Sequence, residues 1–140
     1  MMNAAETRTG GCLCGAVRFA ITGAMRSVVN CHCGQCRRSH GHYAAYAATN
    51  PDNLTFTEDR GLAWYRSSDV ARRGFCADCG SSLFWKPKDK PHIAVAAGSL
   101  DLPTGLTTTG DIFTDDKGDY YKIEDGRANW PGSMLNEEQP

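Results

Sequence analysis

The sequence predicts an antiparallel all-β fold in a single domain. Short runs of β-type residues, bounded by Gly, Pro, Asn and Asp, recur along the chain. Helical periodicity is scarce, and no long helices separate these runs, which argues against a parallel sheet. The length of 140 residues suits one compact domain with a sizeable core, so disulfides are not needed to compensate for a small one.

The first half of the chain supplies strands and one short helical turn. Residues Ala16–Ile21 alternate in the manner of a strand and end at the turn residues Thr22-Gly23. A helical turn is expected over Gly34–Ser39, and Gly41 should end it. The other strands expected here are Ser27–Asn30, Tyr43–Thr49 and Leu54–Thr57.

The second half continues the same pattern of short strands. The strands expected here are Leu62–Arg66, Ala71–Phe75, Leu83–Lys86 and Ile93–Ala97, with weaker candidates at Ile112–Phe113 and Tyr120–Ile123. We expect residues 1–140 to form one domain with its core at residues 9–125. Residues 126–140 should form a loose polar tail, from which Trp130 and Leu135 could dock on the body.

Composition argues against several kinds of partner. Fifteen Lys and Arg against sixteen Asp and Glu give a net charge of −1, which offers no electrostatic basis for nucleic-acid binding. The longest apolar runs, Tyr43–Ala48 and Ile93–Ala97, fall far short of the ~20 residues that span a bilayer. Because the opening stretch Met1–Gly10 lacks the apolar core of a secretory signal, we expect a cytoplasmic protein with no membrane partner.

Seven cysteines in three tight groups are the most informative feature of the sequence. An odd number leaves one thiol over from any closed set of internal disulfides. In a reducing compartment, clustered cysteines more often bind metal or do redox chemistry. The groups are Cys12 with Cys14, Cys31 with Cys33 and Cys36, and Cys76 with Cys79.

The two outer groups together supply the four ligands of a structural Zn²⁺ site. Cys12 and Cys14 would point to one face if they lay on a strand. Cys76 and Cys79 have the two-residue spacing of a zinc knuckle, which Gly80 can close in the left-handed conformation. One ion held by all four thiolates would join the first strand to the middle of the domain.

The middle group predicts a second Zn²⁺ site with an open position. Cys31, Cys33 and Cys36 offer three sulfurs from one loop, and three protein ligands with a vacant position are typical of catalytic zinc. A fourth protein ligand would instead make the site structural; the candidates are His32, His40 and His42. A redox disulfide between Cys33 and Cys36 is disfavoured because no βαβ pattern surrounds the pair.

Arg37 and Arg38 directly follow the middle group and are the candidate substrate-binding residues. Two guanidinium groups beside an open zinc can hold a substrate carboxylate through bidentate hydrogen bonds. Alternatively, they offset the net negative charge of a zinc ion bound to three thiolates. The two roles are compatible with each other.

Three motifs resemble those of a known family. They are Gly11–Val17, Cys31–Arg37 and Phe75–Ser81, and Gly98–Asp101 adds a fourth similar segment. From Thr9 to Ile123 the chain resembles the glutathione-dependent formaldehyde-activating enzyme family, which includes centromere protein V-like domains. The resemblance implies a β-tent-like fold of small coiled antiparallel sheets. It also implies a structural zinc on the two outer groups and a catalytic-type zinc on the middle group, the same partition that spacing gives.

The activity that this resemblance implies is carbon–sulfur bond chemistry, with a small thiol and an aldehyde as partners. Family members join formaldehyde and glutathione to S-hydroxymethylglutathione, or split that adduct. The sequence departs from the family late in the chain. Asp111-Ile112-Phe113 stands where many relatives have His-Ile, and Tyr120-Tyr121 stands where a Trp is common. If these residues line the pocket, the thiol need not be glutathione.

The leading hypothesis is therefore a zinc-dependent carbon–sulfur lyase or synthase that acts on a small thiol–aldehyde adduct. Cys31, Cys33 and Cys36 would be its catalytic residues, through the zinc ion that they hold. The alternative is a non-catalytic module in which both zinc ions stabilise a binding surface for a protein partner. An exchangeable position on the second ion favours the enzyme, and a fourth protein ligand there favours the module.

Overall fold

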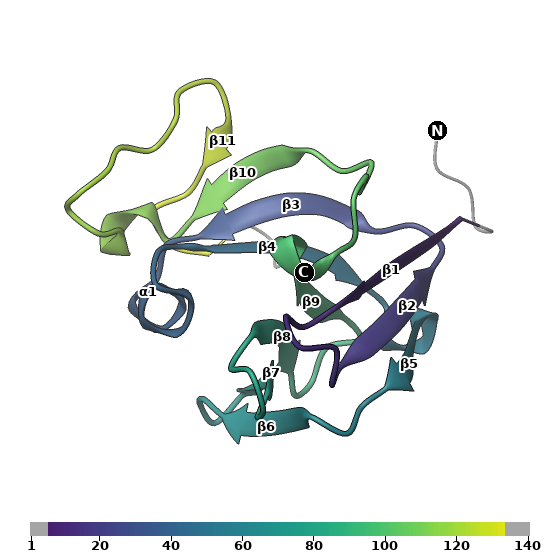
Figure 1. Cartoon of the computed structure of the whole chain (residues 1–140). Helices are drawn as coiled ribbons and strands as arrows, with labels where there is room; N and C mark the ends of the chain where they lie inside the picture. The colour runs from purple at the N-terminus through teal and green to yellow at the C-terminus, as the bar shows by residue number, and fades with distance from the viewer. Residues whose placement is uncertain (1–5, 134–140) are drawn as a thin grey trace.

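Two β-sheets and one short helix make up the computed structural model, which describes residues 6–133 (Figure 1). The smaller sheet has the strand order β1-β2-β5, and both of its pairings are antiparallel. Its strands are β1 (Thr7–Gly11), β2 (Arg18–Thr22) and β5 (Leu54–Glu58). This sheet lies at the right of Figure 1.

The larger sheet has eight strands in the order β11-β10-β3-β4-β9-β8-β7-β6. They are β3 (Arg26–Cys31), β4 (Ala44–Thr49), β6 (Leu62–Arg66), β7 (Ala71–Cys76), β8 (Ser82–Pro87), β9 (Ile93–Ala96), β10 (Thr108–Ile112) and β11 (Ala128–Asn129). The two sheets confirm the predicted all-β class. The eight strands predicted with the clearest patterns all form, with bounds that differ by two residues or fewer.

One edge of the larger sheet is parallel, which the sequence did not indicate. Strand β10 pairs in parallel with β3, and β11 pairs in parallel with β10. The weak strand predicted at Ile112–Phe113 is the end of β10, whereas the one predicted at Tyr120–Ile123 is wrong because that segment forms a turn. Strand β1 escaped prediction because its buried positions are Arg8 and Gly10, which give no apolar alternation.

The single α-helix, α1 (Gly34–His40), follows β3 directly and confirms the predicted helical turn. Its N-cap is Cys33, whose sulfur accepts a hydrogen bond from the backbone N–H of Cys36. Gly41 ends the helix with a φ of 81°, a conformation that costs glycine little. Short 3₁₀ turns occur at Pro51–Asn53, Ala97–Ser99 and Thr114–Asp116. Between residues 6 and 133 no helix is long and apolar enough to cross a membrane.

Two hydrophobic clusters fill the spaces around the sheets. The first joins the sheets through Phe19 of β2 and Phe84 of β8, whose ring centroids are 5.2 Å apart. The second surrounds the middle cysteines and includes Val29 and Tyr46. Trp130 packs against this second cluster, so the segment after β11 docks on the body as the sequence allowed. Leu135, the other residue expected to dock, lies outside the described residues.

Candidate metal centres and the adjacent cavity

Four cysteines from two distant loops meet at one point of the structure. Cys12 and Cys14 lie in the loop between β1 and β2, and Cys76 and Cys79 lie at the turn between β7 and β8. The four sulfur atoms all lie within 4.8 Å of one another. The two members of the first pair therefore converge through a loop and not, as the sequence suggested, through the alternation of a strand.

The donor set of this four-cysteine cluster fits a tetrahedral Zn²⁺ ion. The Sγ atoms of Cys12 and Cys14 are 3.8 Å apart, and those of Cys14 and Cys76 are also 3.8 Å apart. Four sulfurs at the usual Zn–S distance of ~2.3 Å around a tetrahedral ion are about 3.8 Å apart. Backbone N–H groups also donate to these sulfurs, from Val17 to Cys12 at 3.2 Å and from Cys79 to Cys76 at 3.5 Å.

Gly80 closes the knuckle between Cys76 and Cys79. Its φ of 82° confirms the left-handed conformation expected from the sequence. Its N–H donates to the carbonyl oxygen of Cys76 at 2.8 Å, which folds the chain tightly enough to bring both sulfurs to one side.

The middle cysteines form a second cluster, at the junction of β3 and α1. Cys31 ends β3, Cys33 caps α1 and Cys36 lies in its first turn, with the three sulfurs within 4.8 Å of one another. Interaction with the Cys31 thiol lowers the pKa of Cys33, while interaction with Cys33 raises the pKa of Cys31. Three sulfurs this close cannot all ionise without a cation between them, so the donor set fits a bound metal ion.

Among residues 6–133 no histidine joins the three-cysteine cluster as a fourth ligand. Both ring nitrogens of His32 are occupied, Nε2 by the Asp111 carboxylate at 2.9 Å and Nδ1 by the Tyr121 hydroxyl at 2.6 Å. His40 and His42 hydrogen-bond to tyrosine hydroxyls, those of Tyr46 and Tyr120. The described part of the chain can therefore supply three ligands, which would leave one position of a tetrahedral ion for another molecule.

A cavity of about 220 Å³ opens beside the three-cysteine cluster. Its wall is apolar apart from a few polar groups, an arrangement that is typical of small-molecule sites. The lining residues are Cys31, Cys33 and Cys36, the apolar Val29, Trp85, Ala94, Ile112 and Phe113, and the polar Arg26, Gln35, Tyr46 and Arg73. We call this space the thiol cavity.

Arg73 of β7 is the charged group in contact with the cysteines. Its Nη2 lies 3.6 Å from the Cys36 sulfur and donates to Gln35 Oε1 at 3.2 Å, while Nη1 donates to the Tyr46 hydroxyl at 3.2 Å. The guanidinium group is therefore placed to balance negative charge on these sulfurs when they ionise.

Arg37 and Arg38 lie on α1 and are not among the residues that line the thiol cavity. Arg38 is exposed and Arg37 is half-buried. Their substrate-binding role stays a prediction. Arg26 and Arg73, which do line the cavity, went unnoticed in the sequence because a charged residue on a short strand reads as a solvent-facing position.

A buried hydrogen-bond network fixes the backbone between Cys31 and Cys33. The side chains of His32 and Asp111 are 2% and 0% exposed. Asp111 also accepts from Arg127, from Nε at 3.1 Å and from Nη2 at 3.2 Å. Burial alone would raise the pKa of Asp111, but hydrogen bonds from Arg127 and His32 outweigh it and hold the pKa below its usual value. Asp111 and Tyr121, where the sequence departs from the pattern of the family it resembles, thus lie next to the cysteine loop, because both hydrogen-bond to His32.

We expect Asp111→Asn to destabilise the fold by about 3–5 kcal/mol, the usual cost of removing one partner of a buried ion pair. An ionised Asp only accepts hydrogen bonds, whereas the amide of Asn turns an N–H₂ group toward the donors of Arg127 or His32. Urea unfolding of the metal-loaded protein measures the change. Glu124→Gln is the matched control, because Glu124 binds the same arginine but is 70% exposed. If the free energy of unfolding falls by less than about 1 kcal/mol in both variants, the buried ion pair of Asp111 does not stabilise the fold as expected.

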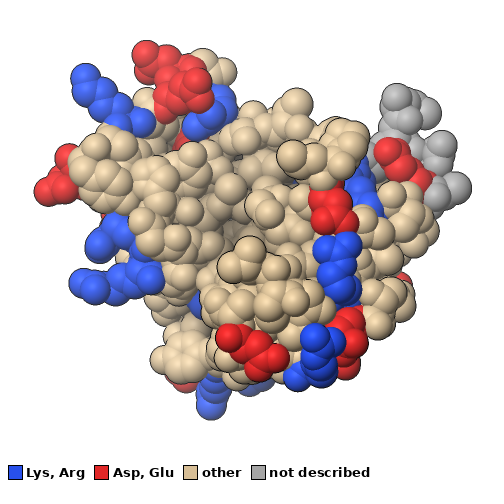
Figure 2. Space-filling view, viewed as in Figure 1, with Lys and Arg blue, Asp and Glu red and all other residues tan. Residues whose placement is uncertain are grey.

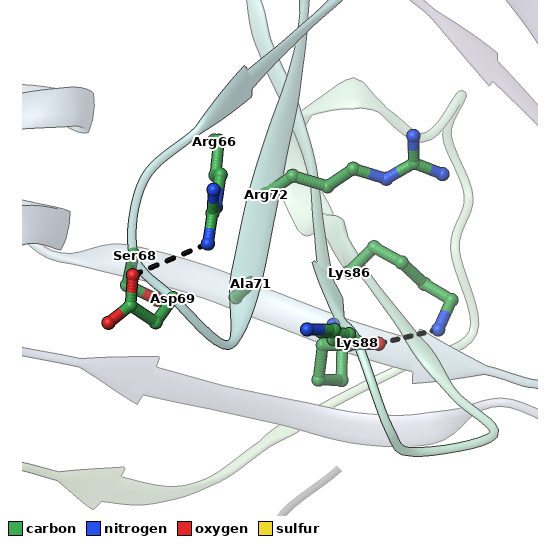
Figure 3. Close-up of a pocket in the computed structure, with 8 residues that line it drawn as sticks. Arg66, Ser68, Asp69, Ala71, Arg72, Lys86 and Lys88 are labelled. Atoms are coloured by element: carbon green, nitrogen blue, oxygen red, sulfur yellow. Dashed lines mark hydrogen bonds and ion pairs between the residues drawn. The ribbon is translucent and has the colours of Figure 1, made fainter.

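Two hollows more than twice the volume of the thiol cavity lie away from the three cysteines. A groove of about 690 Å³ runs between α1 and the loop that holds Cys12. The face shown in Figure 2 carries its charged side chains mostly at the edges and is hollowed near its centre. The other hollow, of about 540 Å³, lies on the β6–β7 hairpin and is basic (Figure 3). Three of its cations are already engaged: Arg66 pairs with Asp69 at 3.3 Å, Arg72 lies over the Trp64 ring, and Lys86 donates to the Pro87 carbonyl.

Comparison with known proteins agrees with this cysteine architecture. A family model described as "Glutathione-dependent formaldehyde-activating enzyme" matches residues 7–116, well over half of the chain. The chain belongs to this family. This match confirms the resemblance carried by the three cysteine motifs. Membership of the family supports a formaldehyde-activating or lyase role for the protein.

Two individual proteins are also similar to the chain. It is 28% identical over 114 residues to an uncharacterized lyase of Schizosaccharomyces pombe, with 80% of this chain and 82% of the relative covered. A crystal structure of a Rhodobacter sphaeroides protein has a similar fold, with a TM-score of 0.57 at 20% identity. That likeness covers 87% of this chain and 98% of the other.

Proposed function

We propose that the protein is a zinc-dependent carbon–sulfur lyase or synthase acting on the adduct of a small thiol and an aldehyde such as formaldehyde. The observation that supports this most is the three-cysteine cluster, which lines the thiol cavity and finds no fourth ligand within residues 6–133. The four-cysteine cluster would hold a second, structural Zn²⁺. S-hydroxymethylglutathione is the adduct that the family description suggests.

The thiol cavity provides what such a reaction needs besides the metal. A Zn²⁺ ion held by Cys31, Cys33 and Cys36 would bind the substrate sulfur and favour its thiolate form. Arg73 offsets the negative charge that accumulates on the sulfurs. The apolar walls, among them Trp85 and Phe113, exclude water and hold the aldehyde carbon against the sulfur. Burial raises the pKa of Tyr46, so its hydroxyl stays protonated. With Arg73 Nη1 and the Nε2–H tautomer of His40 donating to its oxygen, this hydroxyl can donate its own proton to the aldehyde oxygen.

The proposal predicts that thiols bind directly to the metal of the three-cysteine site. In Co²⁺-substituted protein, adding glutathione or a smaller thiol should strengthen the sulfur-to-metal absorption band, because a fourth sulfur joins the ion. The same thiols should accelerate formation or cleavage of the formaldehyde adduct. The protein with metal only in the four-cysteine site is the control and should respond to neither. If no thiol changes the spectrum and none accelerates adduct formation, the non-catalytic zinc module is the better description.

A further inference from the structure

Arg26, at the start of β3, puts an uncompensated positive charge at the wall of the thiol cavity. Its Nη2 donates to the carbonyl oxygen of Tyr46 at 3.0 Å. Its Nε and Nη1 are buried and hydrogen-bond to no described residue, and no carboxylate of residues 6–133 forms an ion pair with it. Burial without a compensating anion lowers the pKa of Arg26 to about 10. A buried guanidinium group in this state favours an anionic partner.

The charges around the thiol cavity leave Arg26 free for a ligand. Three thiolates and one divalent cation carry a single net negative charge, and Arg73 lies against it at 3.6 Å from the Cys36 sulfur. Before a substrate binds, Arg26 is then a surplus positive charge. Neighbouring lysines add to the positive charge of Arg26. Burial lowers the pKa of His92 most, and Lys86, Arg26 and Lys90 lower it further.

The size of the thiol cavity limits the ligand. Its volume of about 220 Å³ lies below the ~300–1,000 Å³ that is usual for pockets holding drug-sized molecules. Phe113, which lines it, has a φ of 56°, a left-handed conformation that is rare for a large side chain. Its backbone N–H donates to the Gly132 carbonyl at 2.9 Å, so the segment after β11 holds this wall in place.

We infer that the thiol cavity takes a short mercapto-carboxylate, with its sulfur at the three cysteines and its carboxylate at Arg26. This inference rests on the proposed function and narrows its substrate class. The thiol carries its carboxylate a few bonds from the sulfur, because both groups must fit within one small cavity. Arg26 is the specificity-determining residue, and it takes the place that the sequence suggested for Arg37 and Arg38.

The test compares a thiol acid with its neutral counterpart on Co²⁺-substituted full-length protein. The probes are 3-mercaptopropionate, 3-mercaptopropionamide and glutathione, and the readout is the sulfur-to-metal absorption band. We expect the acid to bind at least about tenfold more tightly than the amide, in line with a charge-assisted hydrogen bond, and more tightly than glutathione. Arg26→Gln should remove the preference for the acid while leaving metal content and amide binding unchanged. Arg26→Lys, which keeps the positive charge, should retain part of the preference for the acid.

Each other outcome has a distinct meaning. Arg66→Gln is the control and should keep the preference for the acid, because Arg66 is an exposed arginine that pairs with Asp69 and lies outside the thiol cavity. If acid and amide bind equally to the unaltered protein, the carboxylate site is wrong while the proposed thiol chemistry stands. If Arg37→Gln or Arg38→Gln abolishes the preference and Arg26→Gln does not, the anchor lies on α1 and the inference is overturned. If glutathione binds more tightly than 3-mercaptopropionate, the limit that the cavity volume sets on ligand size is wrong. If no thiol perturbs the spectrum, the proposed function itself fails.

Discussion

Replacing Cys79 by Ser is expected to remove one metal ion and to unfold most of the domain. The four-cysteine cluster joins the loop after β1 to the turn between β7 and β8, so its ion links the smaller sheet to the larger one. Structural zinc supplies on the order of 10 kcal/mol in small modules, which is comparable to the whole stability of a typical domain. Circular dichroism and elemental analysis of the purified variant measure both effects.

A neighbouring substitution serves as the control for Cys79→Ser. Asp78 lies in the same knuckle but is exposed, and its carboxylate is not part of the sulfur cluster. Asp78→Asn should therefore keep its metal content and its melting temperature. A Cys79→Ser protein that melts like the unaltered one would show that the four-cysteine cluster holds no structural ion.

Replacing Cys36 by Ser is expected to abolish the second metal site and all activity while leaving the fold largely intact. Its partners Cys31 and Cys33 are close in sequence, so the metal closes only a short loop. The entropy removed from the unfolded chain grows with loop length, which makes this ion a weaker constraint than the first. Metal content should fall by one equivalent, and thiol binding should disappear from the Co²⁺ spectrum.

The comparison of Cys36→Ser with Cys79→Ser separates the two clusters. Ser39→Ala, at an exposed position of the same helix, should retain both metal ions and the melting behaviour of the unaltered protein. If Cys36→Ser unfolds the domain as thoroughly as Cys79→Ser, the middle cluster is structural and the proposed catalytic role is lost.

The strands could be predicted from the sequence because their signals are local, and the two cysteine clusters because ligand chemistry limits how the cysteines combine. A β-type run bounded by turn residues predicts the conformation of its own backbone. The predicted and observed bounds agree, for example, at Leu62–Arg66. The division of seven cysteines into sets of four and three follows from ligand chemistry, since tetrahedral sites need four donors. The structure brings the same two sets of sulfurs together.

The parts that escaped prediction depend on contacts between distant segments. Strand β1 exists because it pairs with β2, with Gly10 opposite Phe19, and its own residues give no strand pattern. The parallel pairing of β10 with β3 brings Asp111 to Asn30 and so to His32, a meeting of segments about eighty residues apart. A residue such as Arg127, in what reads as a polar tail, becomes a partner of that buried carboxylate only in the folded chain.

The sequence by itself determined the all-β class, the family and the grouping of the cysteines, whereas the tertiary structure decided which charges face the thiol cavity. Arg72 and Arg73 are adjacent in sequence and equally basic. Because successive strand residues point to opposite faces, Arg72 lies over the Trp64 ring at 4.1 Å and Arg73 lies against Cys36 at 3.6 Å. A shift of one residue in the register of β7 would exchange them, and register is set by pairing with β6 and β8 rather than by the arginines themselves.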